Sequence, residues 1–251
     1  MTGVQTCALP IWYRMNLNVK FMISDIPTVL GALPVTLKLT FASLFFAILL
    51  AVLFGICILK KIPVLRQLVI GFNTFIKGVP LIVQLLFCYY ALPYVLRAFD
   101  GVLGYHYDPK HPSYFGFAVV AFAFNYGAYM TDVVVSSYKA VDKGQLEAAY
   151  SVGMSTFQAM WKIVIPQAVV ISIPNLSNYF MWLLKATSLA SVVNVFELLA
   201  TARASTAVNY AILEGYLVAA GIYWLVCIIA EQILKRINKK MNRYQKTVSA
   251  V

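Results

Sequence analysis

Polar and charged side chains stand at intervals inside the apolar stretches of this sequence, where they could bind or pass a polar solute. The set consists of Asn125, Tyr129, Asp132, Asn175, Asn178, Lys185, Thr187, Ser188 and Glu197. At membrane depth a carboxylate such as Asp132 costs roughly 2.5–3.5 kcal/mol to insert, so we expect it to face protein or water. Ser, Thr and Asn side chains also bond one helix to another. Each residue is therefore a candidate for either a solute path or an interhelical hydrogen bond.

Residues for catalysis or metal binding form no recognisable set. The sequence has no Gly-rich loop ending in Lys-Ser or Lys-Thr and no Ser, His and Asp combination, so we expect no ATP site and no enzymatic activity in this chain. His106, Asp108 and His111 are close in sequence. Pro109 and Pro112 exclude the helix that would place both histidines on one face, so we expect a loop without a metal or other cofactor.

The composition is that of an integral membrane protein. Of the 251 residues, 61% are hydrophobic and 12% are charged, an apolar share that a soluble domain of this size could not bury. The formal net charge is +11, but the basic residues flank apolar runs instead of forming one face, which argues against nucleic acid binding. The cysteines form no CxxC pair and are expected to be small apolar residues: Cys7, Cys57, Cys88 and Cys227.

Five apolar runs are long enough to cross a membrane, because about 20 helical residues span the hydrocarbon core. They lie near residues 39–59, 79–96, 114–137, 167–184 and 212–234, the fourth interrupted by Pro174. A shorter apolar segment at 192–202, which contains Glu197, predicts a partly inserted helix. The sequence thus indicates an all-α membrane protein with lipid as its surroundings.

The chain divides into four parts around these runs. Residues 1–14 resemble translated vector sequence more than a signal peptide, and we expect the native chain to begin at Met15. Residues 15–30 predict an amphipathic lead-in, 31–234 the membrane domain, and 235–251 a basic cytoplasmic tail.

A polar segment at 142–166 separates the third and fourth runs and carries its own helix signals. Asp142 and Gln145, three residues apart, predict a capping box. Leu146, Ala149, Tyr150 and Gly153 fall on one helical face, with Gly153 placed to end the helix in the left-handed conformation.

A second capping box, Ser155 with Gln158, predicts that another helix starts at once, and Pro166 predicts a further break. A short helix with a stripe of small apolar residues suits docking in a partner's groove. A surface helix on lipid headgroups is the other interpretation, but such helices usually carry bulkier apolar residues and more basic ones.

Several segments resemble those of a known transporter family. Glu147-Ala148-Ala149, Gly153, Ile163 and Ile165-Pro166 resemble the "EAA" loop of membrane subunits of ABC importers. The segment Lys77-Gly78-Val79-Pro80 resembles the "RGTP" segment of polar amino acid permeases. Lys185-Ala186-Thr187-Ser188-Leu189 resembles their "K-D-T-S-L" element, with Ala186 in place of Asp. Asp132 stands where the family often has Glu followed by Arg-Gly.

The resemblance implies the permease subunit of a polar amino acid ABC importer, with five transmembrane helices in the type I ABC importer permease (MetI-like) fold. It implies that the EAA loop fits a cleft on the ATP-hydrolysing subunit through Gly144, Gln145, Glu147, Ala148, Ala149 and Gly153. It further implies two ATPase subunits that bind the ATP, a second permease copy or a similar permease, and an extracytoplasmic solute-binding protein. Cystine, glutamine, histidine, arginine and glutamate all remain open as substrates.

The distribution of basic residues predicts the orientation in a bacterial plasma membrane. With the tail in the cytoplasm, five spans place the N-terminus outside, and most Lys and Arg residues then lie inside, as the positive-inside rule requires. The rule also accounts for Lys77 without any transport role, as an anchor beside a helix start. A channel or secondary carrier working without ATP, and an intramembrane enzyme, are the alternatives. Inverted repeats would favour the carrier, paired reactive groups the enzyme, and neither pattern is visible.

Overall fold

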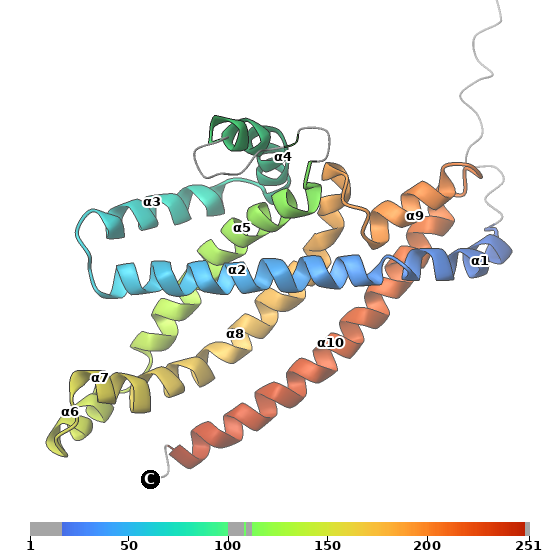
Figure 1. The fold of residues 1–251 in the computed structure, drawn as a ribbon. Coiled ribbons are helices and arrows are strands. Elements are labelled where there is room, and N and C mark those ends of the chain that lie inside the picture. Colours follow the sequence, from blue (N-terminus) through green and yellow to red (C-terminus); the bar gives the residue numbers. More distant parts are fainter. Residues whose placement is uncertain (1–16, 100–107, 109–111, 249–251) are drawn as a thin grey trace, which may run out of the picture.

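The computed structural model describes residues 17–99, 108 and 112–248, and the regular elements within them are helices (Figure 1). The α-helices are α1 (Val19–Leu30), α2 (Leu33–Leu59), α3 (Leu65–Gly78), α4 (Leu81–Ala98), α5 (Tyr114–Lys139), α6 (Lys143–Ser151), α7 (Thr156–Ala159), α8 (Ile165–Ala186), α9 (Leu198–Thr206) and α10 (Ile212–Val248). A π turn, η1 (Met160–Val164), joins α7 to α8, and a 3₁₀ turn, η2 (Thr187–Val193), follows α8. In this part of the chain 5 helical stretches are long and apolar enough to cross a membrane. The predicted five-span, all-α fold is confirmed.

Helix α5 forms the centre of the bundle. In its apolar window 67% of the residues are buried, against 22% in that of α2. It packs against α2, α3, α4 and α8, and its Phe122 and Met130 are fully buried together with Leu39 and Leu85. Helices α2, α4 and α8 keep one face toward α5, whereas α10 packs on α8, α9 and α1. The spans leave large apolar side chains outward, as lipid-facing helices do.

A second apolar cluster joins α1, α9 and the first half of α10 at one end of the molecule (Figure 1). Val29, Leu198 and Ile222 belong to it. The buried carboxylate of Asp25 accepts a hydrogen bond from Ser205 Oγ at 2.9 Å. The predicted amphipathic lead-in is therefore a helix packed on its own protein.

Helix α3 was not predicted, because its 14 residues alternate polar and apolar types too often for a span. The chain turns sharply at Lys61 and Val64, where φ is +51° and +63°, and α3 runs back beside α2 (Figure 1). Lys77 thus lies at the far end of α3, roughly 18 Å along the helix from this turn, and shortly before the start of α4. The interpretation of Lys77 as a positive-inside anchor beside a helix start stays a prediction. The second candidate span is α4 alone, and α3 is a separate helix that precedes it.

Prolines shape the spans differently from one another. Val79 is extended, with φ −100° and ψ 132°, and so ends α3 directly before Pro80. At Pro166 the predicted break was wrong. The π turn η1 leads directly into α8, and Pro166 lies in the first turn of that helix, where its missing N–H costs little. Pro174 lies within a continuous α8. Helix α10 likewise continues past the predicted end of the fifth span, through the basic residues, to Val248.

Candidate functional site

Helix α6 begins with the predicted Asp142 cap, but Gln145 does not have the predicted hydrogen-bond partner. Asp142 is extended, and its Oδ1 accepts a hydrogen bond from Gly144 N at 2.7 Å. Gln145 does not complete a capping box: its Oε1 accepts from Gln167 Nε2 at 3.3 Å. Because α8 starts close by, the Gln145 amide ties α6 to the membrane helix that follows, and this part of the sequence interpretation was wrong.

The end of α6 is set by Gly153, as predicted. Gly153 has φ +79°, its N–H donates to Tyr150 O at 3.0 Å, and Met154 N–H donates to Ala149 O at 3.0 Å. These two bonds define a Schellman motif. The second predicted cap is also confirmed, since Gln158 N donates to Ser155 Oγ at 3.3 Å and Ser155 N to Gln158 Oε1 at 3.0 Å.

One face of α6 packs inward and the opposite face is exposed. Ala149 is 2% exposed, on the side of α6 that packs against α7 and η1. Glu147, Ala148 and Tyr150 are exposed. The small side chain of Ala149 therefore serves the close approach of α6 to its own bundle, and the surface left for a partner centres on Glu147 and Ala148.

Exposed apolar side chains that the sequence reasoning missed lie beside this surface. Val152 is 74% exposed and Phe157 is 71% exposed. The rings of Phe157 and Trp161, four residues apart, have centroids 6.1 Å apart. The i, i+4 spacing of two aromatic residues after the Ser155 cap was the available signal.

A charged and aromatic cluster joins α3, α5 and α8 inside the span region. Lys77 Nζ is ion-paired with Asp132 Oδ2 and lies 5.7 Å from the centroid of the Tyr129 ring, a cation–π distance. Tyr129 stacks on Tyr179 at 6.1 Å, and Tyr179 meets Trp182 edge to face at 5.2 Å. Tyr129 and Asp132 were predicted path residues, whereas Tyr179 and Trp182 were not named.

Asn125 lies next to the break between α3 and α4. Its Nδ2 donates to Gln84 Oε1 at 3.3 Å, and Gln84 Nε2 donates to Ile76 O at 2.7 Å and Val79 O at 2.9 Å. Gln84 thereby satisfies carbonyl groups that the extended Val79 leaves without helical partners. For Asn125 the structure shows the interhelical hydrogen bond that the sequence left open.

Thr187 and Glu197 belong to a separate, buried polar cluster. Thr187 Oγ1 donates to Leu184 O at 2.6 Å and lies 3.2 Å from Tyr223 Oη. Tyr223 Oη donates to Glu197 Oε2 at 2.6 Å, and Glu197 caps α9 by accepting from Leu199 N and Ala200 N at 2.9 and 2.8 Å.

Burial raises the pKa of the Glu197 carboxyl, while the hydrogen bond from Tyr223 and those from the backbone act in the opposite direction. The carboxyl group is fully buried at the start of α9. The segment at 192–202 is not a crossing, because α9 has 9 residues. The helix is short, as predicted, and its partial insertion in the membrane stays a prediction.

The remaining predicted path residues lie on α8 and its end. Asn175, Asn178 and Lys185 are exposed, and Ser188 Oγ donates to Lys185 O at 2.9 Å. Among the described residues there is no group of three His, Cys, Asp or Glu side chains that could hold a metal ion. His106 and His111, like residues 1–14, lie outside the described residues.

Comparisons with known proteins all point to transport proteins. A protein-family model described as "Binding-protein-dependent transport system inner membrane component" matches residues 43–243. The chain is 35% identical over 228 residues to the "Probable amino-acid permease protein YxeN" of Bacillus subtilis, covering 91% of this chain and 97% of the relative. It is 36% identical over 219 residues to the "L-cystine transport system permease protein TcyB" of the same organism, covering 87% and 88%.

Two solved structures share the architecture. A chain of an amino acid ABC transporter crystallised with histidines superposes with a TM-score of 0.77 at 29% identity, covering 90% of this chain and 100% of that one. A chain of the MetNI methionine ABC transporter in an inward-facing conformation gives a TM-score of 0.61 at 14% identity, covering 85% and 98%. The second likeness concerns the fold alone.

Proposed function

The chain belongs to the family of binding-protein-dependent transport system inner membrane components, and from this premise we propose how its parts carry a polar amino acid across the membrane. It is a multi-pass protein of the bacterial plasma membrane and the permease subunit of an ABC importer, a transport component that works with an ATPase and a binding protein. Amino acids appear in the names of relatives that span nearly its whole length.

The proposed contact with the ATPase is the outer face of α6. The observation that carries it is a short helix, fixed at both ends by caps and tied to α8 through Gln145, which keeps Glu147 and Ala148 exposed at one end of the bundle. Helix α6 therefore transmits a movement of the partner to α8, because its caps keep both of its ends from unwinding. ATP is bound and hydrolysed by that partner, since this sequence holds no phosphate-binding loop.

Glu147→Lys tests this contact. We expect uptake of labelled amino acid to be abolished while the amount of permease in the membrane stays unchanged, because a reversed charge at the centre of an interface opposes docking. Co-purification of the ATPase subunit should be lost in the same variant. Lys139→Glu makes an equal-sized charge change at an exposed position of α5 and should leave both readouts intact. Normal uptake by Glu147→Lys would contradict the proposal.

The proposed solute path runs along the cluster of Lys77, Tyr129, Asp132 and Tyr179. This cluster has charges of both signs beside aromatic rings, which suits a zwitterion: an ammonium group is attracted by Asp132 and by ring faces, and a carboxylate by Lys77. The side chain of Asp132 is 68% exposed, so the cluster opens on a face of the bundle. We propose that a second permease, either another copy or a similar chain, closes this face, because five spans are too few to surround a path alone.

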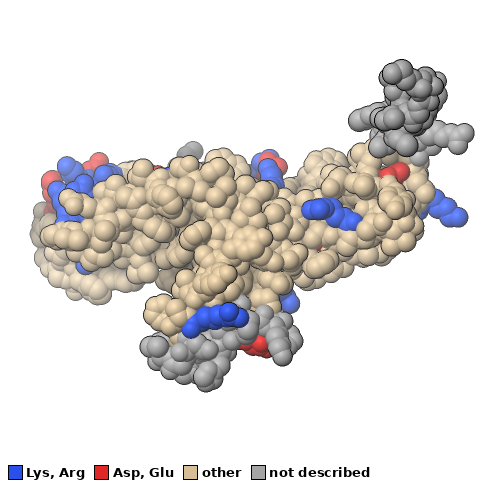
Figure 2. Space-filling model, turned by 90° about the horizontal axis from the view of Figure 1, so that it is seen from above, with Lys and Arg blue, Asp and Glu red and all other residues tan. Residues whose placement is uncertain are grey.

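The proposed orientation places α6 and the C-terminus in the cytoplasm and the N-terminus outside. In Figure 1 the turn after α2, the α6–α7 segment and the C-terminus share one end of the molecule. Lys and Arg gather at this end in Figure 2. Lys60 and Lys61 belong to the turn after α2 by their place in the chain. This distribution supports the proposal through the positive-inside rule.

A further inference from the structure

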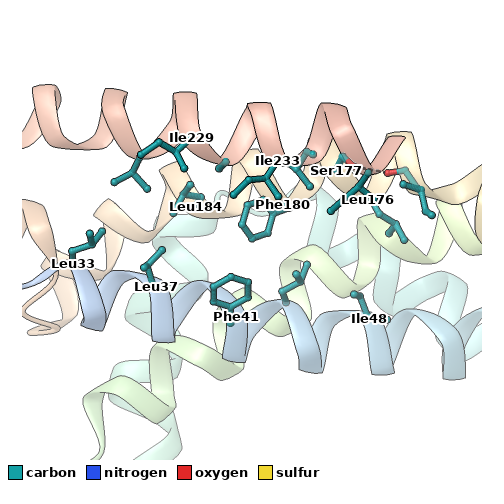
Figure 3. Close-up of a pocket in the computed structure, with 16 residues that line it drawn as sticks. Leu33, Leu37, Phe41, Ile48, Leu176, Ser177, Phe180, Leu184, Ile229 and Ile233 are labelled. Atoms are coloured by element: carbon teal, nitrogen blue, oxygen red, sulfur yellow. Dashed lines mark hydrogen bonds between the residues drawn. The ribbon is translucent and has the colours of Figure 1, made fainter. Parts of the chain in front are cut away.

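A groove of about 570 Å³ lies between α2, α8 and α10 (Figure 3). It exists because α10 diverges from α2 toward the end that holds the C-terminus (Figure 1), while α8 packs on both helices. Leu33 and Ile48 of α2 mark its two ends, 15 residues apart. A helix of that length measures roughly 22 Å, which exceeds the roughly 15 Å of hydrocarbon in one leaflet.

The walls of the groove are made of large side chains. In Figure 3, Phe41 and Phe180 point toward one another across it, with ring centroids 5.8 Å apart. Most other lining residues are Leu and Ile, and Ser177 and Ala230 are the small ones. Helix–helix contacts in membranes favour Gly, Ala, Ser and Thr, which let backbones approach closely. A flexible hydrocarbon chain fits bulky, uneven walls better than another helix does.

The groove is open along its side. Phe41 is 56% exposed, and Ile229 and Ile233 of α10 are 59% and 51% exposed. A chain can therefore enter sideways from the surrounding bilayer. An acyl chain lying in the groove would cover these apolar side chains and replace contacts that the divergent α10 cannot make with α2.

Basic residues follow where α10 leaves the groove. Ile237 is the last lining residue of α10, and Lys240, three residues on, continues the same helical face. Arg236 flanks this face, and both basic side chains are exposed. Long basic side chains at the end of a membrane helix reach the headgroup level, where they attract negative charge.

We propose that the groove holds an acyl chain of an anionic phospholipid whose headgroup is bound by Arg236 and Lys240. The proposal goes beyond transport: it assigns a lipid site on the side of the bundle, away from the cluster of Lys77 and Asp132. The site ties α10 to α2 and α8 through the lipid, at the half of the bundle where these helices lie furthest apart.

The test is lipid binding to the purified full-length chain in detergent, measured by native mass spectrometry with phosphatidylglycerol and with phosphatidylcholine of identical acyl chains. We expect the anionic lipid to bind roughly 25-fold more tightly, since each of two basic side chains contributes about fivefold. The double variant R236Q/K240Q should bind the two lipids equally. Ala230→Phe fills the groove and should weaken both lipids by about tenfold or more, whereas Ala220→Phe, at an exposed α10 position outside the groove, should change neither.

Equal affinities of the unaltered chain for the two lipids would overturn the proposal. So would Ala230→Phe that binds lipid as Ala220→Phe does. If a second permease copy occupied the groove instead, Ala230→Phe would shift the monomer–dimer ratio in the same spectra without changing lipid binding. Should Ala230→Phe fail to fold, R236Q/K240Q decides alone, because it changes only exposed side chains. No readout requires ATPase or amino acid, so failure here leaves the transport function untouched.

Discussion

The pairing of Lys77 with Asp132 places two opposite charges beside Tyr129 in the span region of the bundle. The Asp132 side chain is 68% exposed, so the pair adds at most about 1 kcal/mol to the free energy of unfolding. The ion pair matters more for solute binding than for stability, because it keeps a carboxylate and an ammonium group side by side on an otherwise apolar face. A zwitterionic solute carries the complementary charges.

Asp132→Asn should separate transport from stability. We expect uptake to fall by about tenfold or more, because the amide keeps the size of the side chain but cannot balance Lys77 or attract an ammonium group. The thermal unfolding midpoint should move by only a few degrees, as expected for less than about 1 kcal/mol. Glu231→Gln breaks another exposed ion pair, with Lys235 at 2.7 Å in α10, and serves as the matched control. An equal loss of uptake in both variants would count against the assignment.

At this scale, local signals could be read from the sequence and tertiary partners could not. The Asp142 cap, the Ser155–Gln158 box and the conformation of Gly153 depend on residues within a few positions, and they were predicted. Lys77 and Asp132 are 55 residues apart, so their pairing depends on the return of α3 beside the bundle. Glu197 was a path candidate by type, and nothing in the sequence indicated its bond to Tyr223.

Among the elements, α6 depends most on one residue at its end. A Cβ added at Gly153 would meet no atom within 4 Å, so the obstacle to another residue there is the φ of +79° alone. Holding an L-residue in that conformation costs about 1–2 kcal/mol. This cost destabilises the Schellman motif that ends α6.

Gly153→Ala should therefore loosen α6 without disturbing the bundle. We expect faster amide hydrogen exchange in α6, weaker co-purification of the ATPase and reduced uptake. Gly221→Ala is the matched control: it lies in helical α10 with nothing within 4 Å of an added Cβ, and alanine there should stabilise the helix by roughly 0.5–1 kcal/mol. If both substitutions left hydrogen exchange in α6 unchanged, the importance of the left-handed end would be refuted.

Spans were easier to predict than the segments between them. Hydrophobic length defines α2, α5 and α10 directly, because the bilayer imposes it. Helix α3 escaped prediction since it is short and gains its stability from packing against α2 and α5. The π turn before Pro166 escaped because a proline indicates where an N–H is missing, not how the preceding turn adjusts to it.

The molecule as a whole has one end that gathers α6, α7 and the last residues of α10, and another that gathers α1 and α9 (Figure 1). Positive charge gathers at the first end, which through the positive-inside rule supports the proposal that this end faces the cytoplasm. An ATPase can reach α6 only in this orientation. In this orientation, a reagent that cannot cross the membrane should reach only the end that holds α1 and α9 in intact cells.

Cysteine labelling tests this orientation. In a chain whose four cysteines are replaced, Val208→Cys lies between α9 and α10, where Val208 is 83% exposed, and Lys143→Cys lies at the start of α6. We expect a membrane-impermeant maleimide to label Val208→Cys in intact cells and Lys143→Cys only after permeabilisation. The reverse pattern would invert the topology and exclude the proposed coupling.

The extended Val79, followed by Pro80, separates α3 from α4. The Gln84 side chain of α4 spans this junction by donating to Ile76 O and Val79 O, so it holds the end of α3 to α4. Lys77 lies just before Val79, so a change in the angle between α3 and α4 turns its ammonium group relative to Asp132 of α5, while the opposite end of α3 travels furthest.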